Sequence, residues 1–160
     1  MMNVSLICVG KMKEKFYIEA AAEYNKRLSP FCRLQIIELP EEKLPPTPSQ
    51  ALIEAALRKE ADAIRSRIPP NSQVVALCIE GKLHSSKDLA VHLRTWENNS
   101  AKHLVFLIGS SYGLDETLKS EAQVRLSMSP MTFPHHLARV MLLEQVYRAF
   151  QINAGSPYHK

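Results

Sequence analysis

The chain has 160 residues, 46% of them hydrophobic and 22% charged, which fits one soluble globular domain and excludes a disordered or fibrous protein. No segment is long enough to cross a membrane, and no basic stretch precedes the first apolar run, so we expect neither a signal peptide nor an anchor. The net charge of +4 favours an anionic partner such as RNA without requiring one. Three cysteines without metal-ligand spacing predict reduced thiols in a cytoplasmic protein.

Strand-like and helix-like segments alternate along the whole chain. Short runs of apolar and β-branched residues predict strands over 4–9, 33–39, 74–79, 104–108 and 124–128. Apolar residues at helical spacing predict helices over 13–28, from 47 to about 68, after 85, after 115, and over 137–152. This alternation predicts a single α/β domain over residues 1–160, with a mostly parallel sheet flanked by helices.

Capping residues mark the starts of three predicted helices. Thr47 is the predicted N-cap of the second helix, with Gln50 closing a capping box. Ser85 and Asp88 form a second capping box, and Asp115 precedes a short helix that it can cap.

Three loops at strand ends are candidates for ligand binding, because ligands of parallel α/β folds bind beyond the carboxyl ends of strands. One loop follows Leu77, and a second starts at Gly109, where an apolar strand stops abruptly. The third spans 128–133 and contains Pro130, which keeps it rigid and non-helical. A dinucleotide site is not expected, because the first strand ends in the lone glycine Gly10.

The last predicted helix is apolar nearly all round, with valine, leucine, methionine, tyrosine and phenylalanine on every side. Such a helix must be covered on two sides. A sheet covers one of them, so the pattern predicts that a second subunit covers the other in a two-fold homodimer.

The stretch from Gly109 to Gly113 also matches G-x-S-x-G, the nucleophile elbow of serine hydrolases, with Ser111 as nucleophile. Acidic residues and histidines follow in the required order. Against this alternative, the chain is short for such an enzyme and offers no HGGG-like oxyanion hole.

Four segments together resemble the large-subunit ribosomal RNA methyltransferase H family, which belongs to the SPOUT class of S-adenosylmethionine enzymes. They are LIGSSYGL, LSMSPMTFPH, RVMLLEQVYRA and the terminal PYH, and the early segments VGKMKEKF and EYNKRL extend the likeness over the whole chain. One position departs from the family pattern: Ser110 stands where the family has the second glycine of I-G-G.

The resemblance implies a SPOUT-type α/β knot, with a trefoil knot in the C-terminal part, and a homodimer. It implies methylation of N3 of a pseudouridine in a 23S rRNA hairpin loop of the assembled ribosome, with S-adenosylmethionine as cofactor and no metal. A non-catalytic ribosome- or RNA-binding protein of the same fold is the alternative. The residues that would contact the cofactor are Leu77, Gly109, Met128, Ser129, Pro130, Met131, Thr132 and Phe133.

The chemistry requires N3 to lose a proton, so a base or an anion-stabilising cation is needed. The candidates are His135, Arg139, Glu144, Arg148, Tyr158 and His159. We expect Arg139 to stabilise negative charge and Tyr158 and His159 to line the nucleotide pocket; which group is the base stays open. His135 and His136 are adjacent on a helix and point in different directions, so they do not predict a metal site.

Overall fold

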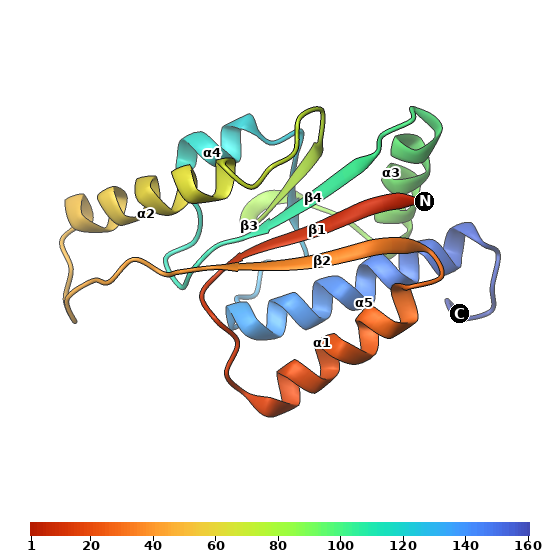
Figure 1. Ribbon diagram of the computed structural model, residues 1–160, viewed down its shortest axis with the longest axis horizontal. Helices are drawn as coiled ribbons and strands as arrows, with labels where there is room; N and C mark the ends of the chain where they lie inside the picture. Colours follow the sequence, from red (N-terminus) through yellow and green to blue (C-terminus); the bar gives the residue numbers. More distant parts are fainter.

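Five parallel strands form one sheet in the order β2-β1-β4-β3-β5 in the computed structural model, which describes residues 1–160 (Figure 1). The strands are β1 (Met2–Val9), β2 (Cys32–Leu39), β3 (Gln73–Leu83), β4 (His103–Ile108) and β5 (Val124–Ser127). The helices are α1 (Lys15–Leu28), α2 (Gln50–Arg65), α3 (Ser86–Asn98), α4 (Glu116–Glu121) and α5 (His135–Asn153). The predicted α/β alternation with a parallel sheet is confirmed.

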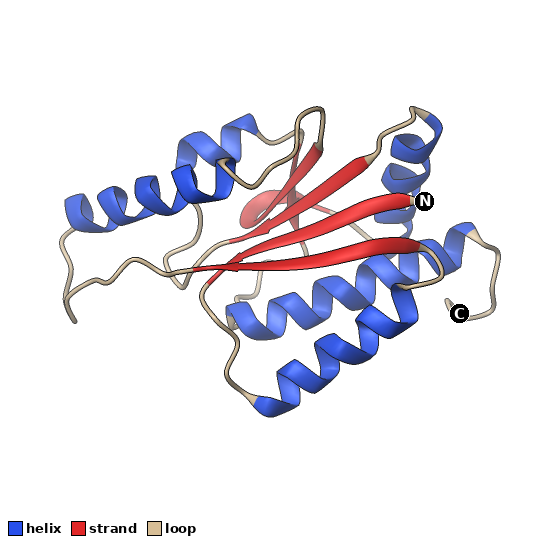
Figure 2. Cartoon of the chain, in the orientation of Figure 1, coloured by secondary structure: helices blue, strands red, loops and turns tan.

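Helices cover both faces of the sheet (Figure 2). Side chains of α1, α3 and α5 form one hydrophobic core, and those of α2 and α4 form the other. Strand β4 serves both cores because its side chains alternate: Phe106 faces the first core, and Val105 and Leu107 face the second. A central strand buried on both faces is expected to read as an apolar run, as this one does.

Helix α5 is covered more completely by its own chain than its sequence suggests. It packs on the sheet and against α1 and α3, and none of its residues is exposed. Helices α1 and α3 therefore cover part of the α5 surface for which the sequence predicts a second subunit. The dimer stays a prediction, and it needs support from other surfaces.

Strand β3 differs from its predicted bounds, because it does not turn away after Ile79. Leu77 and Lys82 both pair with Leu126 of β5, so the residues between them bulge out and the strand then resumes. Gly81 permits this bulge, since a Cβ there would lie 2.8 Å from the carbonyl oxygen of Arg125.

Two of the three predicted helix caps are confirmed. Ser85 and Asp88 form the complete capping box of α3, and the Asp115 side chain accepts a hydrogen bond from the backbone N–H of Leu118. The predicted cap at Thr47 is wrong: α2 starts two residues later, where the Ser49 hydroxyl accepts from the N–H of Leu52. No helix in the chain combines the length and apolarity needed to span a bilayer.

Candidate functional site

A cavity of about 630 Å³ lies beyond the carboxyl ends of β3, β4 and β5, and we call it the large cavity. All three candidate loops contribute to it, because parallel strands bring their carboxyl ends to one edge of the sheet. Its walls mix apolar side chains with loop backbone. This size and character are typical of small-molecule sites, which span roughly 300–1,000 Å³.

The loop from Gly109 to Gly113 forms one wall. A Cβ on Gly109 would collide with the carbonyl group of Gly113, so only glycine allows the loop to close on itself. Gly113 adopts a φ of +86°, and its N–H donates to the carbonyl oxygen of Ser110. Ser110 is buried, and its hydroxyl accepts from the N–H of Tyr112, so the side chain that replaces the family glycine is accommodated within the turn.

The irregular segment after β5 forms another part of the wall. The Ser127 hydroxyl donates to the carbonyl oxygen of Ser129, and the Ser129 hydroxyl accepts from the N–H of Met131. These bonds hold the loop without regular secondary structure. Met131 is 72% exposed at the rim, where an apolar side chain costs free energy unless something covers it.

Most residues that the family resemblance assigned to the cofactor lie together in this cavity. Its lining includes Leu77, Gly109, Met128, Ser129, Met131, Thr132 and Phe133. Pro130 belongs to the same loop but does not line the cavity.

The bulge of β3 supplies lining residues that the sequence did not reveal. Cys78, Ile79 and Glu80 face the cavity, as does Lys119 of α4. The Lys119 ammonium group is buried and bonds to Glu80 and to Glu116, at 2.6 Å. Burial alone would lower the pKa of Lys119, but the two carboxylates raise it, so this buried group stays charged.

Arg139, which we expect to stabilise negative charge, is not among the residues that line the large cavity. Its side chain is 2% exposed and donates at 2.6 Å both to Glu38 and to the carbonyl oxygen of Gly10. The guanidinium group thus ties α5 to the ends of β1 and β2.

His135, at the start of α5, does line the cavity. Burial lowers the pKa of its imidazole, and the neighbouring His136 and Arg139 lower it further. The ring is therefore neutral at pH 7 and able to accept a proton. The side chain of His136 turns elsewhere, to the carboxylate of Glu14 at 3.0 Å.

The C-terminal tail folds back onto α5. The Tyr158 hydroxyl donates to Glu144 at 2.9 Å, and Glu144 also binds the Arg148 guanidinium group at 2.6 Å. Arg148 in turn lies over the Tyr158 ring and within 3.2 Å of Nδ1 of His159. Tyr158 and His159 are thus fixed at α5, and neither lines the large cavity.

Ser111 lacks the surroundings of a hydrolase nucleophile. It is exposed, its φ is not positive, and no histidine side chain bonds to it. The strained strand-to-helix turn that presents such a serine is absent, so the hydrolase alternative is dropped. No three histidine, cysteine, aspartate or glutamate side chains are grouped as metal ligands.

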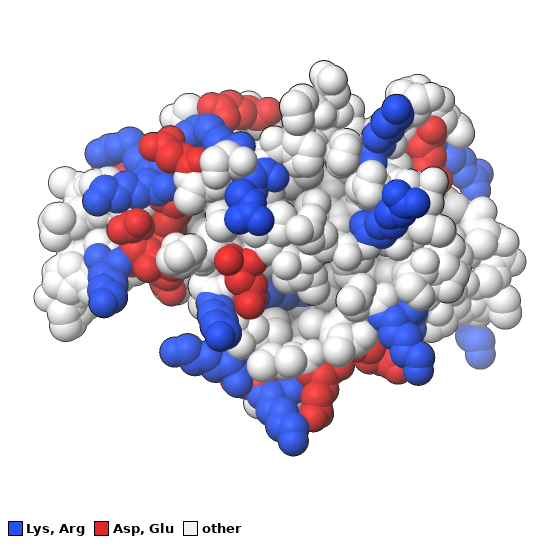
Figure 3. All heavy atoms as spheres, in the orientation of Figure 1, with Lys and Arg blue, Asp and Glu red and all other residues white.

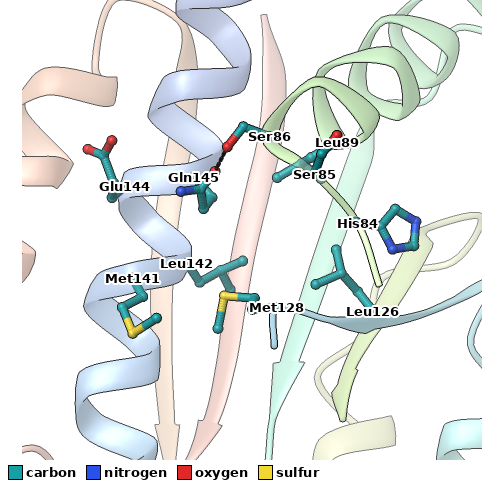
Figure 4. A pocket seen from close by; sticks show the side chains of 10 residues that line it. All are labelled: His84, Ser85, Ser86, Leu89, Leu126, Met128, Met141, Leu142, Glu144 and Gln145. Carbon is teal, nitrogen blue, oxygen red and sulfur yellow. Dashed lines mark hydrogen bonds between the residues drawn. The ribbon is translucent and has the colours of Figure 1, made fainter. Parts of the chain in front are cut away.

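A second cavity, which we call the small cavity, has a volume of about 320 Å³ and lies between the start of α3 and the middle of α5 (Figure 4). It shares Leu126 and Met128 with the large cavity, so the two are neighbours. Glu144, which holds the tail, belongs to its lining. Apart from the capping serine Ser85, no sequence pattern indicated this cavity.

Known proteins match this chain over its whole length. A family model described as "Predicted SPOUT methyltransferase" matches residues 2–159. Proteins named "Ribosomal RNA large subunit methyltransferase H" from Streptococcus suis and Bifidobacterium animalis subsp. lactis are each 46% identical to it, and one from Leuconostoc mesenteroides is 43% identical. Each alignment covers 99% of this chain and 100% of the relative. The α/β chain with its cavity at the carboxyl edge of the sheet is an enzyme that belongs to the SPOUT methyltransferase family.

Proposed function

We propose that this protein uses S-adenosylmethionine to methylate N3 of a pseudouridine in a 23S rRNA hairpin loop of the assembled ribosome. The full-length relatives, named as large-subunit rRNA methyltransferases, support the substrate class. The observation that carries the proposal is the large cavity, which both the Gly109 loop and the segment after Met128 line.

The residues of the large cavity fit such a cofactor. Leu77 and Met131 offer apolar surfaces to the faces of an adenine ring, and backbone groups of the irregular loop after Met128 can bond to its edge. Gly109 lets the other lining loop close on itself, because a Cβ there would meet the backbone of Gly113. Bound there, the cofactor would supply an electrophilic methyl group, and the cavity's main task is to hold donor and acceptor in line.

The acceptor nitrogen must lose its proton as the new N–C bond forms. Among the candidates for the base, only His135 lines the large cavity, and its neutral imidazole has the protonation state that a base needs. We propose that His135 accepts the proton that N3 loses. Arg139 then acts as a positioning residue, because it fixes the helix that carries His135.

The C-terminal tail also has a role in this proposal. Tyr158 and His159 lie beside Glu144, which lines the small cavity next to the site of transfer. There they would help to order the RNA nucleotide. If His159→Ala and a chain lacking residues 157–160 both methylated ribosomes at the normal rate, this role would be wrong.

A homodimer is part of the same proposal. Ile79, Tyr112 and Met131 are exposed apolar side chains at the rim of the large cavity, and a second subunit laid over this edge would bury them. The trefoil knot and a cytoplasmic location are further expectations, the first from the SPOUT family and the second from the ribosomal substrate.

Transfer of a labelled methyl group from S-adenosylmethionine to ribosomes that lack the modification tests the reaction. We expect one methyl group per large subunit, located by nuclease mapping at a pseudouridine. A calorimetric titration with the cofactor separates the enzyme from a non-catalytic RNA-binding protein of the same fold, which would release no heat. Binding without transfer would contradict the proposed substrate.

A further inference from the structure

The small cavity combines apolar and polar lining residues. Leu89, Leu126, Met128 and Leu142 provide an apolar floor between the sheet, α3 and α5. At one end Ser86 of α3 and Gln145 of α5 point toward each other, while Glu144 and His84 lie to either side of that pair (Figure 4). An apolar slot with few convergent polar groups is typical of ligand sites.

The hydrogen bonds at that end leave the Ser86 oxygen free as an acceptor and the Gln145 amide nitrogen free as a donor. The Ser86 hydroxyl donates its proton to Oε1 of Gln145 at 2.6 Å, which leaves the lone pairs of Ser86 Oγ free. Nε2 of Gln145 makes no hydrogen bond within the chain and retains two N–H donors. His84 is already engaged, since its two ring nitrogens lie 2.7 Å from the carbonyl oxygen of Lys82 and 3.2 Å from His92.

We propose that the small cavity receives the target pseudouridine base and that Ser86 and Gln145 read the edge by which this base differs from uridine. The inference rests on the proposed function. Pseudouridine carries an N1–H group beside the C2 carbonyl, where uridine has a C–H group. Ser86 Oγ accepts from N1–H, and the Gln145 amide donates to the C2 carbonyl oxygen.

This placement also orients the reacting nitrogen. N1 and N3 flank the C2 carbonyl, so an edge bound through N1 and O2 leaves N3 at the side of the ring that is not hydrogen-bonded. Leu126 and Met128 line both cavities and form the boundary across which N3 would meet the methyl donor. A flipped-out base is read by this combination of polar edge contacts and apolar faces.

Ser86 should make the enzyme prefer pseudouridine to uridine. A site built to accept a hydrogen bond leaves its acceptor unpaired when the substrate lacks the donor, and this discriminates strongly between the two. Gln145 recognises a carbonyl group that both bases share. Replacing Ser86 should therefore change the preference between the two bases, whereas replacing Gln145 should lower the rate with both.

The test compares ribosomes that carry pseudouridine or uridine at the target position. We expect Ser86→Ala to lower kcat/KM for pseudouridine about tenfold more than it lowers kcat/KM for uridine. Gln145→Leu should lower both rates about tenfold or more, and Ser86→Thr, which keeps the hydroxyl, should retain the preference. Ser120→Ala and Gln50→Leu, at exposed positions on α4 and α2, are the matched controls.

Calorimetry with S-adenosylmethionine accompanies each variant, and the cofactor affinity should stay at the wild-type value. An unchanged preference in Ser86→Ala would overturn the proposal, as would a parallel loss of cofactor affinity. If a second copy of the chain fills the cavity instead, Gln145→Leu shifts the sedimentation coefficient and Ser86→Ala lowers both rates alike, which also overturns it. Failure of the wild type to methylate either ribosome refutes the proposed function itself.

Discussion

Arg139 illustrates how a residue in a family motif can have a structural task. The motif places it in the segment R-V-x-x-x-E-x-x-Y-R-A, which suggests contact with substrate, yet its guanidinium group is buried against Glu38 and Gly10. The partner Glu38 lies 101 residues earlier in the sequence, and no local pattern announces the pair. Position in a motif therefore predicted importance, and only the fold revealed what the residue touches.

The Glu38–Arg139 pair should contribute strongly to stability. Glu38→Ala leaves a buried guanidinium group without its counter-charge, so we expect a loss of about 3 kcal/mol in the free energy of unfolding, measured with urea. Glu19→Ala, which removes an exposed carboxylate paired with Lys15, is the control and should cost less than about 0.5 kcal/mol. Equal losses of unfolding free energy in the two variants would show that the buried pair stabilises the protein no more than an exposed pair does.

The same pair gives stability a dependence on pH. Burial alone would raise the pKa of Glu38, but hydrogen bonds from the Met12 N–H and from Arg139 lower it overall. A carboxyl whose folded pKa is depressed stabilises the protein above its ordinary pKa, and this contribution is lost as the pH falls through the folded value. The difference between wild type and Glu38→Ala should therefore shrink in acid.

The imidazole of His135 should determine how the reaction rate falls at low pH, the acid limb of the pH–rate profile. Because its pKa is lowered, the neutral base persists below the ordinary histidine value, and kcat/KM for ribosomes should begin to fall only below pH of about 6.5. His135→Gln should lower kcat about 100-fold and abolish this limb. His103→Gln, at the start of β4 and outside the cavity lining, is the matched control. The same limb in His135→Gln would exclude it as the base.

At the scale of the element, patterns confined to one turn were predicted well. The capping box at Ser85 and Asp88 and the cap at Asp115 follow from spacing alone, and both are confirmed. The cap of α2 was misplaced because Thr47 and Ser49 are both able to cap, and the helix uses Ser49. The bulge of β3 depends on pairing with β5, which no local pattern encodes.

Gly109 follows strand β4, and its lack of a side chain lets the loop at the site close on Gly113. In Gly109→Ala the new Cβ would overlap the backbone of Gly113, so the loop must open, and we expect a loss of about 3 kcal/mol in stability together with loss of cofactor binding. Gly155→Ala is the control, because its φ is +70° but no atom lies within 4 Å, and left-handed strain alone costs about 1 kcal/mol. Wild-type cofactor affinity in Gly109→Ala would contradict the role of this loop.

At the scale of the whole molecule, charge limits what the protein can do with naked RNA. The net charge is only +4, and on the face shown in Figure 3 lysine and arginine side chains alternate with aspartate and glutamate. Such a face offers no continuous basic track for a phosphate backbone, and phosphate contacts supply most of the non-specific affinity of nucleic-acid-binding proteins. Recognition should therefore depend on the shape of the ribosome around the target.

Intact ribosomes and purified 23S rRNA should accordingly differ as substrates. We expect kcat/KM for intact ribosomes to exceed that for the free RNA at least about 100-fold at physiological salt, because a protein with few phosphate contacts binds flexible RNA weakly. Lowering the salt concentration should raise the rate on free RNA and narrow the gap, since it strengthens the contacts that remain. A free hairpin methylated as fast as the ribosome would show that the two cavities and the tail suffice for recognition.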